Sequence, residues 1–102
     1  MREKLIRDKL EYIVEQDRVR YCDSGEKKQL LIYKLIEEVQ ELAASDYADK
    51  MEFADVFEVL AELALEAGHT WDKIEHARRL KYLERGGFAK GVVLKLEDPP
   101  TK

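Results

Sequence analysis

The middle of the chain repeats apolar residues every three or four positions, which is the spacing of one face of an α-helix. A long helix is expected from Asp23 to about residue 44, because Asp23 and Glu26 form the capping-box pattern that opens a helix. A second long helix is expected over residues 46–67, with Ser45 as its N-cap. Because only a tight connection at Ser45 separates the two helices, they should lie antiparallel.

Shorter patterns flank this predicted helix pair. Asp8 followed by Glu11 is another capping-box pattern and predicts a short helix over residues 9–16. Gly68 is typical of the position just past a helix end, and beyond it the spacing predicts a last helix over residues 71–85.

Two segments rich in β-forming residues predict short strands. They are RVRYC at residues 18–22 and GVVLKLE at residues 91–97. Because a lone strand leaves its backbone hydrogen-bonding groups unpaired, the two segments should pair as a small ribbon. The expected fold is therefore mostly α, with four helices around a central antiparallel helix pair and a small two-stranded β ribbon.

Composition places the chain among globular proteins. Of its 102 residues, 45% are apolar and 39% are charged, which predicts one core beneath an unusually charged surface. We expect a single domain over residues 1–98, followed by a frayed tail over residues 99–102 that begins with two prolines.

Charge and cysteine content narrow the partners and the compartment. The formal net charge of -4 argues against nucleic acid as a partner, because phosphate backbones select basic surfaces. No apolar run in the sequence approaches the roughly 18 residues of a membrane span, so no membrane partner is expected. The single cysteine, Cys22, excludes an internal disulfide and suits a reducing compartment, so a cytoplasmic location is expected.

The first long helix carries acidic residues beside its predicted buried face. At about 100° per residue, Glu38 falls only about 20° from the apolar Leu31, and Glu41 lies one turn further along the same flank. Lys34 lies between these two glutamates in angle, while Glu37 sits further round. A solvated face does not normally place a carboxylate at the edge of the buried surface, which makes Glu38 a candidate site residue.

The second long helix repeats the arrangement. Glu52 falls between the apolar Val59 and Leu63 on the helical wheel, and Asp55 borders the same arc. If this helix begins late, Glu52 is instead the third residue of a capping box with Asp49. Each long helix thus carries an acidic pair three residues apart, and antiparallel packing would bring the pairs together.

Four carboxylates at a half-buried seam repel one another. Two charges about 5 Å apart cost about 3 kcal/mol at an effective dielectric constant near 20. Either some of the carboxyl groups are protonated, or a divalent cation neutralises them. Ligands that are all oxygen favour Mg²⁺, with Mn²⁺ also possible. For either pair taken alone, an ordinary solvated acidic face is the alternative.

Four sequence blocks then occur in the order found in a known superfamily. They are KLIRDKL at residues 4–10, KLIEEVQEL at 34–42, EFADVFEVL at 52–60 and ERGGF at 84–88. Together they resemble the all-α nucleoside triphosphate pyrophosphohydrolases, the MazG-like superfamily. Within it they are similar to the small phosphoribosyl-ATP pyrophosphohydrolase-like branch of predicted house-cleaning enzymes.

The resemblance implies Mg²⁺-dependent cleavage between the α and β phosphates of a nucleoside triphosphate, which yields a nucleoside monophosphate and pyrophosphate. It implies four metal ligands: Glu38, Glu41, Glu52 and Asp55. The catalytic residues are then Glu38 and Glu41 together with Glu37, which either binds a second ion or positions the attacking water.

A triphosphate also needs cationic partners. On the predicted last helix, Arg78, Lys81 and Arg85 fall within about 60° of one another and are candidates for binding the phosphates. Three further candidates lie nearer the N-terminus: Lys34, Arg7 and Lys9. An exposed, solvated role is the alternative for Arg78, Arg7 and Lys9, and Lys34 has the alternative of tuning the acidic cluster electrostatically.

Three functions remain open at this stage. The leading one is a house-cleaning pyrophosphohydrolase, and phosphoribosyl-ATP hydrolysis in histidine biosynthesis shares its chemistry. The third is a non-catalytic helical dimerisation or binding module that keeps the carboxylates as a polar seam. Because helices of this length leave apolar surface uncovered, and because members of the resembled family assemble, we expect a homodimer.

Overall fold

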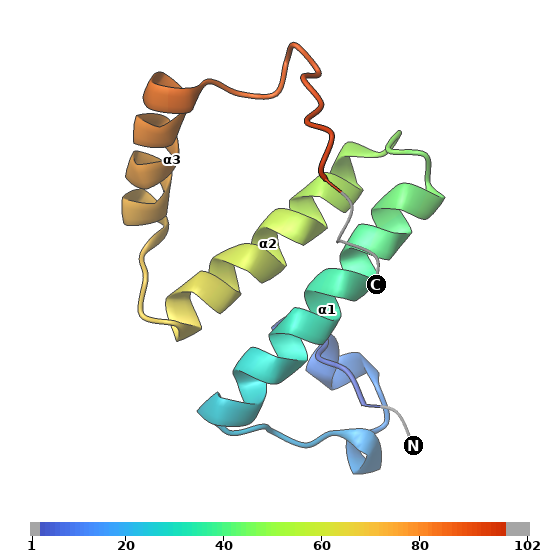
Figure 1. Ribbon diagram of the computed structural model, residues 1–102. Helices are drawn as coiled ribbons and strands as arrows, with labels where there is room; N and C mark the ends of the chain where they lie inside the picture. The colour runs from blue at the N-terminus through green and yellow to red at the C-terminus, as the bar shows by residue number, and fades with distance from the viewer. Residues whose placement is uncertain (1–2, 98–102) are drawn as a thin grey trace, which may run out of the picture. The chain divides into compact units, whose positions relative to one another are not determined.

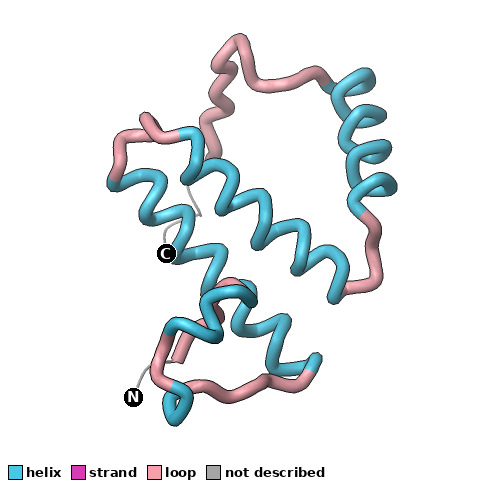
Figure 2. Tube along the Cα trace, turned by 180° about the vertical axis from the view of Figure 1, so that it is seen from behind, coloured by secondary structure: helices cyan, strands magenta, loops and turns pink. Residues whose placement is uncertain are grey.

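The computed structural model describes residues 3–97 and is mostly helical (Figure 1). Along these residues it has three α-helices and two short 3-10 helices, and it has no strand (Figure 2). In chain order the elements are η1 (Asp8–Ile13), η2 (Gln16–Arg18), α1 (Ser24–Ala44), α2 (Lys50–Glu66) and α3 (Trp71–Arg85). The mostly α class is confirmed, and the predicted tail over 99–102 lies outside the described residues.

The chain divides into two compact units, Met1–Trp71 and Asp72–Lys102. The first unit holds both 3-10 helices, α1 and α2, and the second holds all of α3 except its first residue. The expectation of one domain over residues 1–98 stays a prediction.

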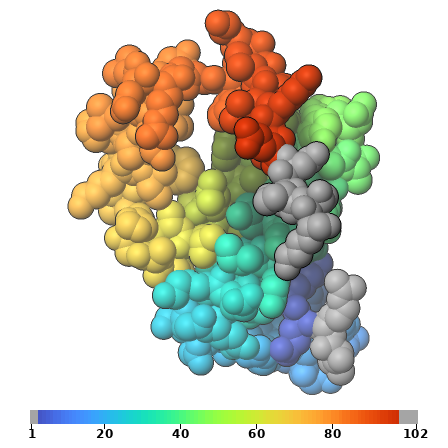
Figure 3. Space-filling view, viewed as in Figure 1, coloured from blue at the N-terminus to red at the C-terminus, as the bar shows by residue number. Residues whose placement is uncertain are grey.

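Helices α1 and α2 form an antiparallel hairpin (Figure 1), and their side chains meet along one seam (Figure 3). Among the described residues the buried apolar side chains are Leu31 of α1 with Val59 and Ala64 of α2. The fourth buried residue is charged: Glu38 keeps only 7% of its surface exposed. A carboxylate therefore sits in the small core of this hairpin.

Ion pairs join the two helices at the end of the hairpin away from the connection. Lys27, near the start of α1, donates hydrogen bonds to the carboxylates of Glu62 and Glu66, near the end of α2, each at 3.2 Å. These half-buried contacts hold the N-terminus of α1 beside the C-terminus of α2. They thereby support the antiparallel register that the connection imposes.

Helix α1 begins and ends through local hydrogen bonds. Asp23 is its N-cap, as predicted, and its side chain accepts the Glu26 N–H at 2.8 Å. At the other end the Tyr47 N–H donates to the Leu42 carbonyl at 3.1 Å. Asp46 lies between them with a φ of 58°, a left-handed conformation that Asp tolerates better than most residues. The chain thus reverses direction without a glycine.

The start of α2 corrects the predicted boundary. The sequence placed Ser45 as the N-cap of a helix over residues 46–67, whereas Ser45 caps the end of α1 and α2 begins at Lys50. The left-handed residues of the connection cannot continue into a helix, so the chain needs a second cap. Asp49 supplies it by accepting the Met51 N–H at 2.9 Å. This is the late start that the alternative reading of Glu52 required.

The end of α2 matches the prediction. Gly68 has a φ of 91° and donates its N–H to the Leu65 carbonyl at 3.0 Å. The His69 N–H donates to the Ala64 carbonyl at 2.8 Å, which completes a Schellman motif. The third α-helix is likewise confirmed over 71–85, and Gly86 follows it with a φ of 77°.

The predicted first helix and first strand are both replaced. In place of an α-helix over 9–16 there are η1 and η2, and Arg7 rather than Asp8 is the N-cap residue, without a side-chain capping bond. Residues 18–22 form no strand, since Arg18 ends η2 and residues 19–22 are coil. The Arg20 guanidinium donates to the carboxylates of Glu3 and Glu26.

The predicted second strand is absent as well. Residues 91–97 are extended coil, and the apolar side chains there are strongly exposed, with Val93 at 84% and Leu94 at 79%. A strand forms only against a neighbour that pairs its backbone groups. Since neither 18–22 nor 91–97 is a strand, the β ribbon is absent from the part of the chain that the structure describes.

Candidate metal centre

Three carboxylates from the two long helices converge on the seam of the hairpin. Glu38 and Glu41 lie one turn apart on α1, and Glu52 lies in the first turn of α2. One oxygen from each lies within 4.8 Å of the others. Although α2 begins late, the Glu52 carboxylate lies with those of the other two glutamates, and its Oε2 forms no hydrogen bond that would close a capping box.

Burial leaves two of these carboxylates without full hydrogen bonding. One Glu38 oxygen, Oε1, lies 3.5 Å from the Lys34 ammonium group. The other Glu38 oxygen, Oε2, is buried and has no hydrogen-bond partner among the described residues. The same holds for Oε2 of Glu52. A buried polar atom without a hydrogen bond destabilises the folded state, so a ligand that binds these oxygens would stabilise it.

The pKa values of Glu38 and Glu52 also indicate that these carboxylates lack favourable partners. Burial, followed by the charge of Glu41, raises the pKa of Glu38, and the nearby Lys34 only partly opposes this. Burial, followed by the charges of Glu41 and Asp55, also raises the pKa of Glu52. Both shifts mean that burial, and after it the neighbouring negative charges, make the ionised forms of Glu38 and Glu52 unfavourable.

Asp55 lies beside the group of three rather than within it. Its charge raises the pKa of both Glu38 and Glu52, so it is a close neighbour of both. Its Oδ1 accepts a hydrogen bond from Arg7 Nη2 at 2.8 Å. The structure therefore brings three of the four expected ligands together and pairs the fourth with an arginine.

Glu37 has a different environment. Its carboxylate accepts hydrogen bonds from Lys4 at 3.3 Å and from Lys34 at 3.5 Å. Burial pushes the pKa of Glu37 up, but the Lys4 hydrogen bond and the two lysine charges together bring it below the ordinary value. Glu37 thus stays ionised next to the cluster without belonging to it.

The expected phosphate-binding residues separate into two groups. Arg7 and Lys34 each form an ion pair with an acidic residue of the site, whereas Lys9 forms no ion pair within residues 3–97. Arg78 is engaged on α3 itself, where it donates to both oxygens of Glu75 at 2.7 and 3.0 Å.

Lys81 and Arg85 are exposed on the same helix. Because α3 belongs largely to the second unit, an approach of these three α3 cations to the carboxylates stays a prediction.

Sequence reasoning missed Lys4 as a neighbour of the site. Lys4 and Glu37 are 33 positions apart, so no local pattern signals their contact. The only available indication was that Lys4 opens the same N-terminal block as Arg7.

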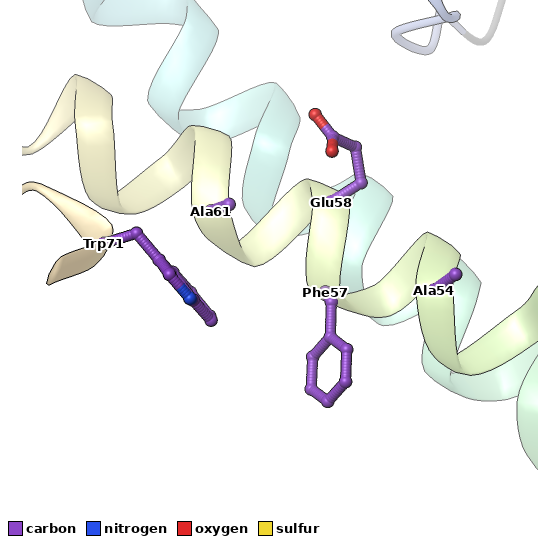
Figure 4. Close-up of a pocket in the computed structure, with 5 residues that line it drawn as sticks. All are labelled: Ala54, Phe57, Glu58, Ala61 and Trp71. Atoms are coloured by element: carbon purple, nitrogen blue, oxygen red, sulfur yellow. The ribbon is translucent and has the colours of Figure 1, made fainter. Parts of the chain in front are cut away.

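An apolar hollow opens on another part of α2 (Figure 4). It has a volume of about 350 Å³, and the Phe57 and Trp71 rings project on the same side of the helix. Ala54 and Ala61 line it with short side chains, while Glu58 points away from the rings in this view. Trp71 is 42% exposed, so it is not a buried core residue.

No helix in the described part of the chain combines the length and the apolar character needed to cross a membrane. Comparisons with protein families, with curated proteins and with solved structures found no match to this chain.

Proposed function

We propose that this protein is a Mg²⁺-dependent nucleoside triphosphate pyrophosphohydrolase of the MazG-like, phosphoribosyl-ATP pyrophosphohydrolase-like type. One observation carries the proposal: three carboxylates from two helices lie within 4.8 Å, and a nine-tenths-buried glutamate among them has an unpartnered oxygen. An acidic patch on the protein surface would need no partner other than water. Glu41 is exposed and Glu52 is half-buried, but the buried charge of Glu38 is destabilising unless a cation joins it.

The residues present fit such an ion. All the available ligands are carboxylate oxygens, which Mg²⁺ and Mn²⁺ prefer, and no histidine or cysteine accompanies them in the group. Glu38, Glu41 and Glu52 would hold the ion, with Asp55 as a fourth ligand. A bound Mg²⁺ would polarise phosphate oxygens and neutralise the charge that develops on them.

The chain's own residues supply the remaining functions. Glu37 is an ionised hydrogen-bond acceptor next to the cluster, so it positions the attacking water. Arg7 and Lys34 are the cations nearest the carboxylates and would bind phosphate oxygens. Lys9, Arg78, Lys81 and Arg85 remain the further candidates for the β and γ phosphates.

The reaction is a hydrolysis. The water oxygen forms a bond to the α-phosphorus while the bond from that phosphorus to the bridging oxygen breaks. The bridging oxygen leaves with pyrophosphate and the nucleoside monophosphate keeps the new oxygen. The proton that the water loses passes to a carboxylate of the site and from there to solvent. We propose house-cleaning of aberrant nucleotides as the role, and phosphoribosyl-ATP hydrolysis would use the same residues.

The direct test is a panel of standard and damaged nucleoside triphosphates, with phosphoribosyl-ATP included, incubated with Mg²⁺. We expect a nucleoside monophosphate and pyrophosphate from at least one triphosphate, and no turnover by the Glu38→Gln variant. Release of a nucleoside diphosphate and inorganic phosphate would contradict the assigned bond. Cleavage of phosphoribosyl-ATP alone would favour the biosynthetic role.

The exposed apolar flank of the hairpin favours a second candidate, a non-catalytic dimerisation module. Among the exposed apolar residues of α1 and α2, six lie along one flank of the hairpin and are between 40% and 59% exposed: Ile32, Ile36, Val39, Phe53, Phe57 and Leu60. A module without a metal site would melt at the same temperature with and without Mg²⁺. The proposed enzyme gains about 2.7 kcal/mol when the ion is present at 100 times its dissociation constant.

The same six residues support a homodimer in either case. Each follows directly after a residue that the hairpin buries or half-buries, so each lies about 100° round from the seam. Because the two helices are antiparallel, a rotation of about 100° from the seam places the residues of both helices on the same side of the hairpin. The result is a continuous apolar surface, and a second copy of this chain would cover it.

A further inference from the structure

The N-terminal segment brings two cations onto the acidic site. Arg7 reaches Asp55 of α2 at 2.8 Å, and Lys4 reaches Glu37 of α1 at 3.3 Å. This segment therefore contacts both helices of the hairpin beside the carboxylate cluster. The two contacts involve residues 48 and 33 positions apart, so they exist only in the folded chain.

The Arg7 contact is of a kind that exchanges easily. The Arg7 side chain is 55% exposed and that of Asp55 is 39% exposed, and ion pairs this exposed contribute little to stability. Arg20, in contrast, donates to two carboxylates at once, those of Glu3 and Glu26. Arg20 is therefore fixed between two partners, whereas a single exposed carboxylate holds Arg7.

Asp55 could pair either with Arg7 or with a divalent cation, because it also lies near Glu38 and Glu52, which would bind such a cation. A divalent cation bound by these glutamates would draw the Asp55 carboxylate toward itself and compete with the guanidinium. Once released, Arg7 would stand next to the cation with its forked donors free. This geometry suits the oxygens of a phosphate bound to that cation.

We infer that Arg7 exchanges partners when the site fills, from Asp55 to an anionic oxygen of the ligand, and so couples cation binding to anion binding. The inference rests on the proposed metal site and adds its regulation. Cation binding frees the anion-binding residue, and by thermodynamic linkage the bound anion strengthens cation binding by the same factor. Without a cation, Arg7 neutralises Asp55 and is withheld from the ligand.

The first test measures Mn²⁺ alone, by calorimetry, on wild type and on Arg7→Ala. Removing the competitor should tighten Mn²⁺ binding about twofold to fivefold, the range expected for an exposed ion pair. Arg18→Ala is the matched control, because it removes the same charge from η2, where Arg18 forms no ion pair within the described residues. Equal Mn²⁺ affinity in wild type and Arg7→Ala would overturn the exchange.

A second arm separates the ion pair from the general field of a positive charge. In an Asp55→Asn background, Arg7→Ala should no longer change Mn²⁺ affinity, because there is no carboxylate left to release. Binding stays measurable by electron paramagnetic resonance because Glu38, Glu41 and Glu52 remain. Equal tightening in both backgrounds would mean that Arg7 acts only through its charge, and would refute the exchange.

The third arm uses inorganic tripolyphosphate at saturating Mg²⁺. Arg7→Ala should weaken its binding at least about fivefold, since a hydrogen bond to a charged group is lost, while Arg18→Ala leaves it unchanged. Unchanged tripolyphosphate affinity in Arg7→Ala would contradict the handover. If wild type binds no Mn²⁺ at all, the proposed metal site itself fails. If it binds Mn²⁺ and Arg7→Ala has no effect, only the exchange fails.

Discussion

At the level of single side chains, Glu38 is the residue on which the proposed metal site depends most. It is 7% exposed, it lies among the few buried residues of the hairpin, and one of its oxygens has no hydrogen-bond partner among the described residues. Lys34 offers it one ion pair at 3.5 Å, which is too weak to offset burial and the charges of Glu41 and Asp55. An ion-free protein therefore keeps a carboxylate where an amide would be more stable.

We predict that Glu38→Gln raises the melting temperature of the ion-free protein at neutral pH. The pKa of Glu38 is raised in the folded state, so its penalty is absent below the unfolded-state pKa, near 4.5, and grows as the pH rises through the folded-state value. Stability lost in this way should return in the variant, by about 4–8 °C for each kcal/mol restored. Melting curves in a chelator from pH 4 to pH 8 measure it.

The matched control is Glu58→Gln, which removes the same charge from an exposed position of α2. It should not change the pH dependence. If Glu38→Gln instead melts at a lower temperature than wild type throughout this range, then the Glu38 carboxylate stabilises the fold and needs no cation.

The C-terminal ends of α1 and α2 both close with a residue in the left-handed conformation, but the residue type differs. At the end of α2, Gly68 adopts a φ of 91° without strain, because glycine has no Cβ. At the end of α1, Asp46 takes the equivalent left-handed position with a φ of 58°. The glycine end was predictable from the sequence, and the aspartate end was not, since Asp is found at helix starts more often than at helix ends.

We predict that Gly68→Ala lowers the free energy of unfolding by about 1–2 kcal/mol, the cost of a left-handed conformation for a residue with a Cβ. No atom lies within 4 Å of the added Cβ, so backbone strain alone produces the effect. Gly25→Ala is the control. Its Cβ would meet Asp23 Oδ1 at an ordinary 3.5 Å, and alanine favours a helix by up to about 1 kcal/mol.

Urea denaturation of the two variants measures both changes. The prediction requires opposite signs, with Gly68→Ala less stable than wild type and Gly25→Ala equal to it or more stable. Equal destabilisation by both substitutions would mean that the left-handed conformation of Gly68 carries no special cost.

For the molecule as a whole, the hairpin buries too little apolar surface for the apolar residues it carries. Leu31, Val59 and Ala64 are its only buried apolar residues in the described chain, while a whole flank of larger side chains stays exposed. An apolar surface that extends over two helices is typical of an interface. Self-association would give these side chains the core that one copy lacks.

We predict a homodimer at micromolar concentration, with a mass twice the 11.9 kDa of the chain. Ile36→Lys places a charge in the middle of the apolar flank and should give a monomer, whereas Glu58→Gln, with the same change in net charge, should leave the dimer intact. Light scattering measures all three. A monomeric wild type at this concentration would refute the proposed interface.

Much of the fold follows from patterns only a few residues long. The capping by Asp23, the stop at Gly68 and the extent of α3 were all predictable, because each depends on neighbours within five positions. The start of α2 was placed four residues too early, because the sequence does not show that Asp46 and Tyr47 turn left-handed. The β ribbon was predicted from the β propensity of two segments that were expected to pair, and β propensity counts only where a neighbour does pair the backbone.

The sequence by itself determined which carboxylates border the seam, since helical periodicity puts Glu38, Glu41 and Glu52 beside apolar positions once a helix is granted. Only the tertiary structure decided which of them meet, which oxygens are left without partners, and that Arg7 and Lys4 come from the N-terminus to pair with Asp55 and Glu37. The reason is the distance along the chain over which each effect acts. Periodicity and capping act over one or two turns of a helix, whereas the burial and charge of the site arise between segments that only folding brings together.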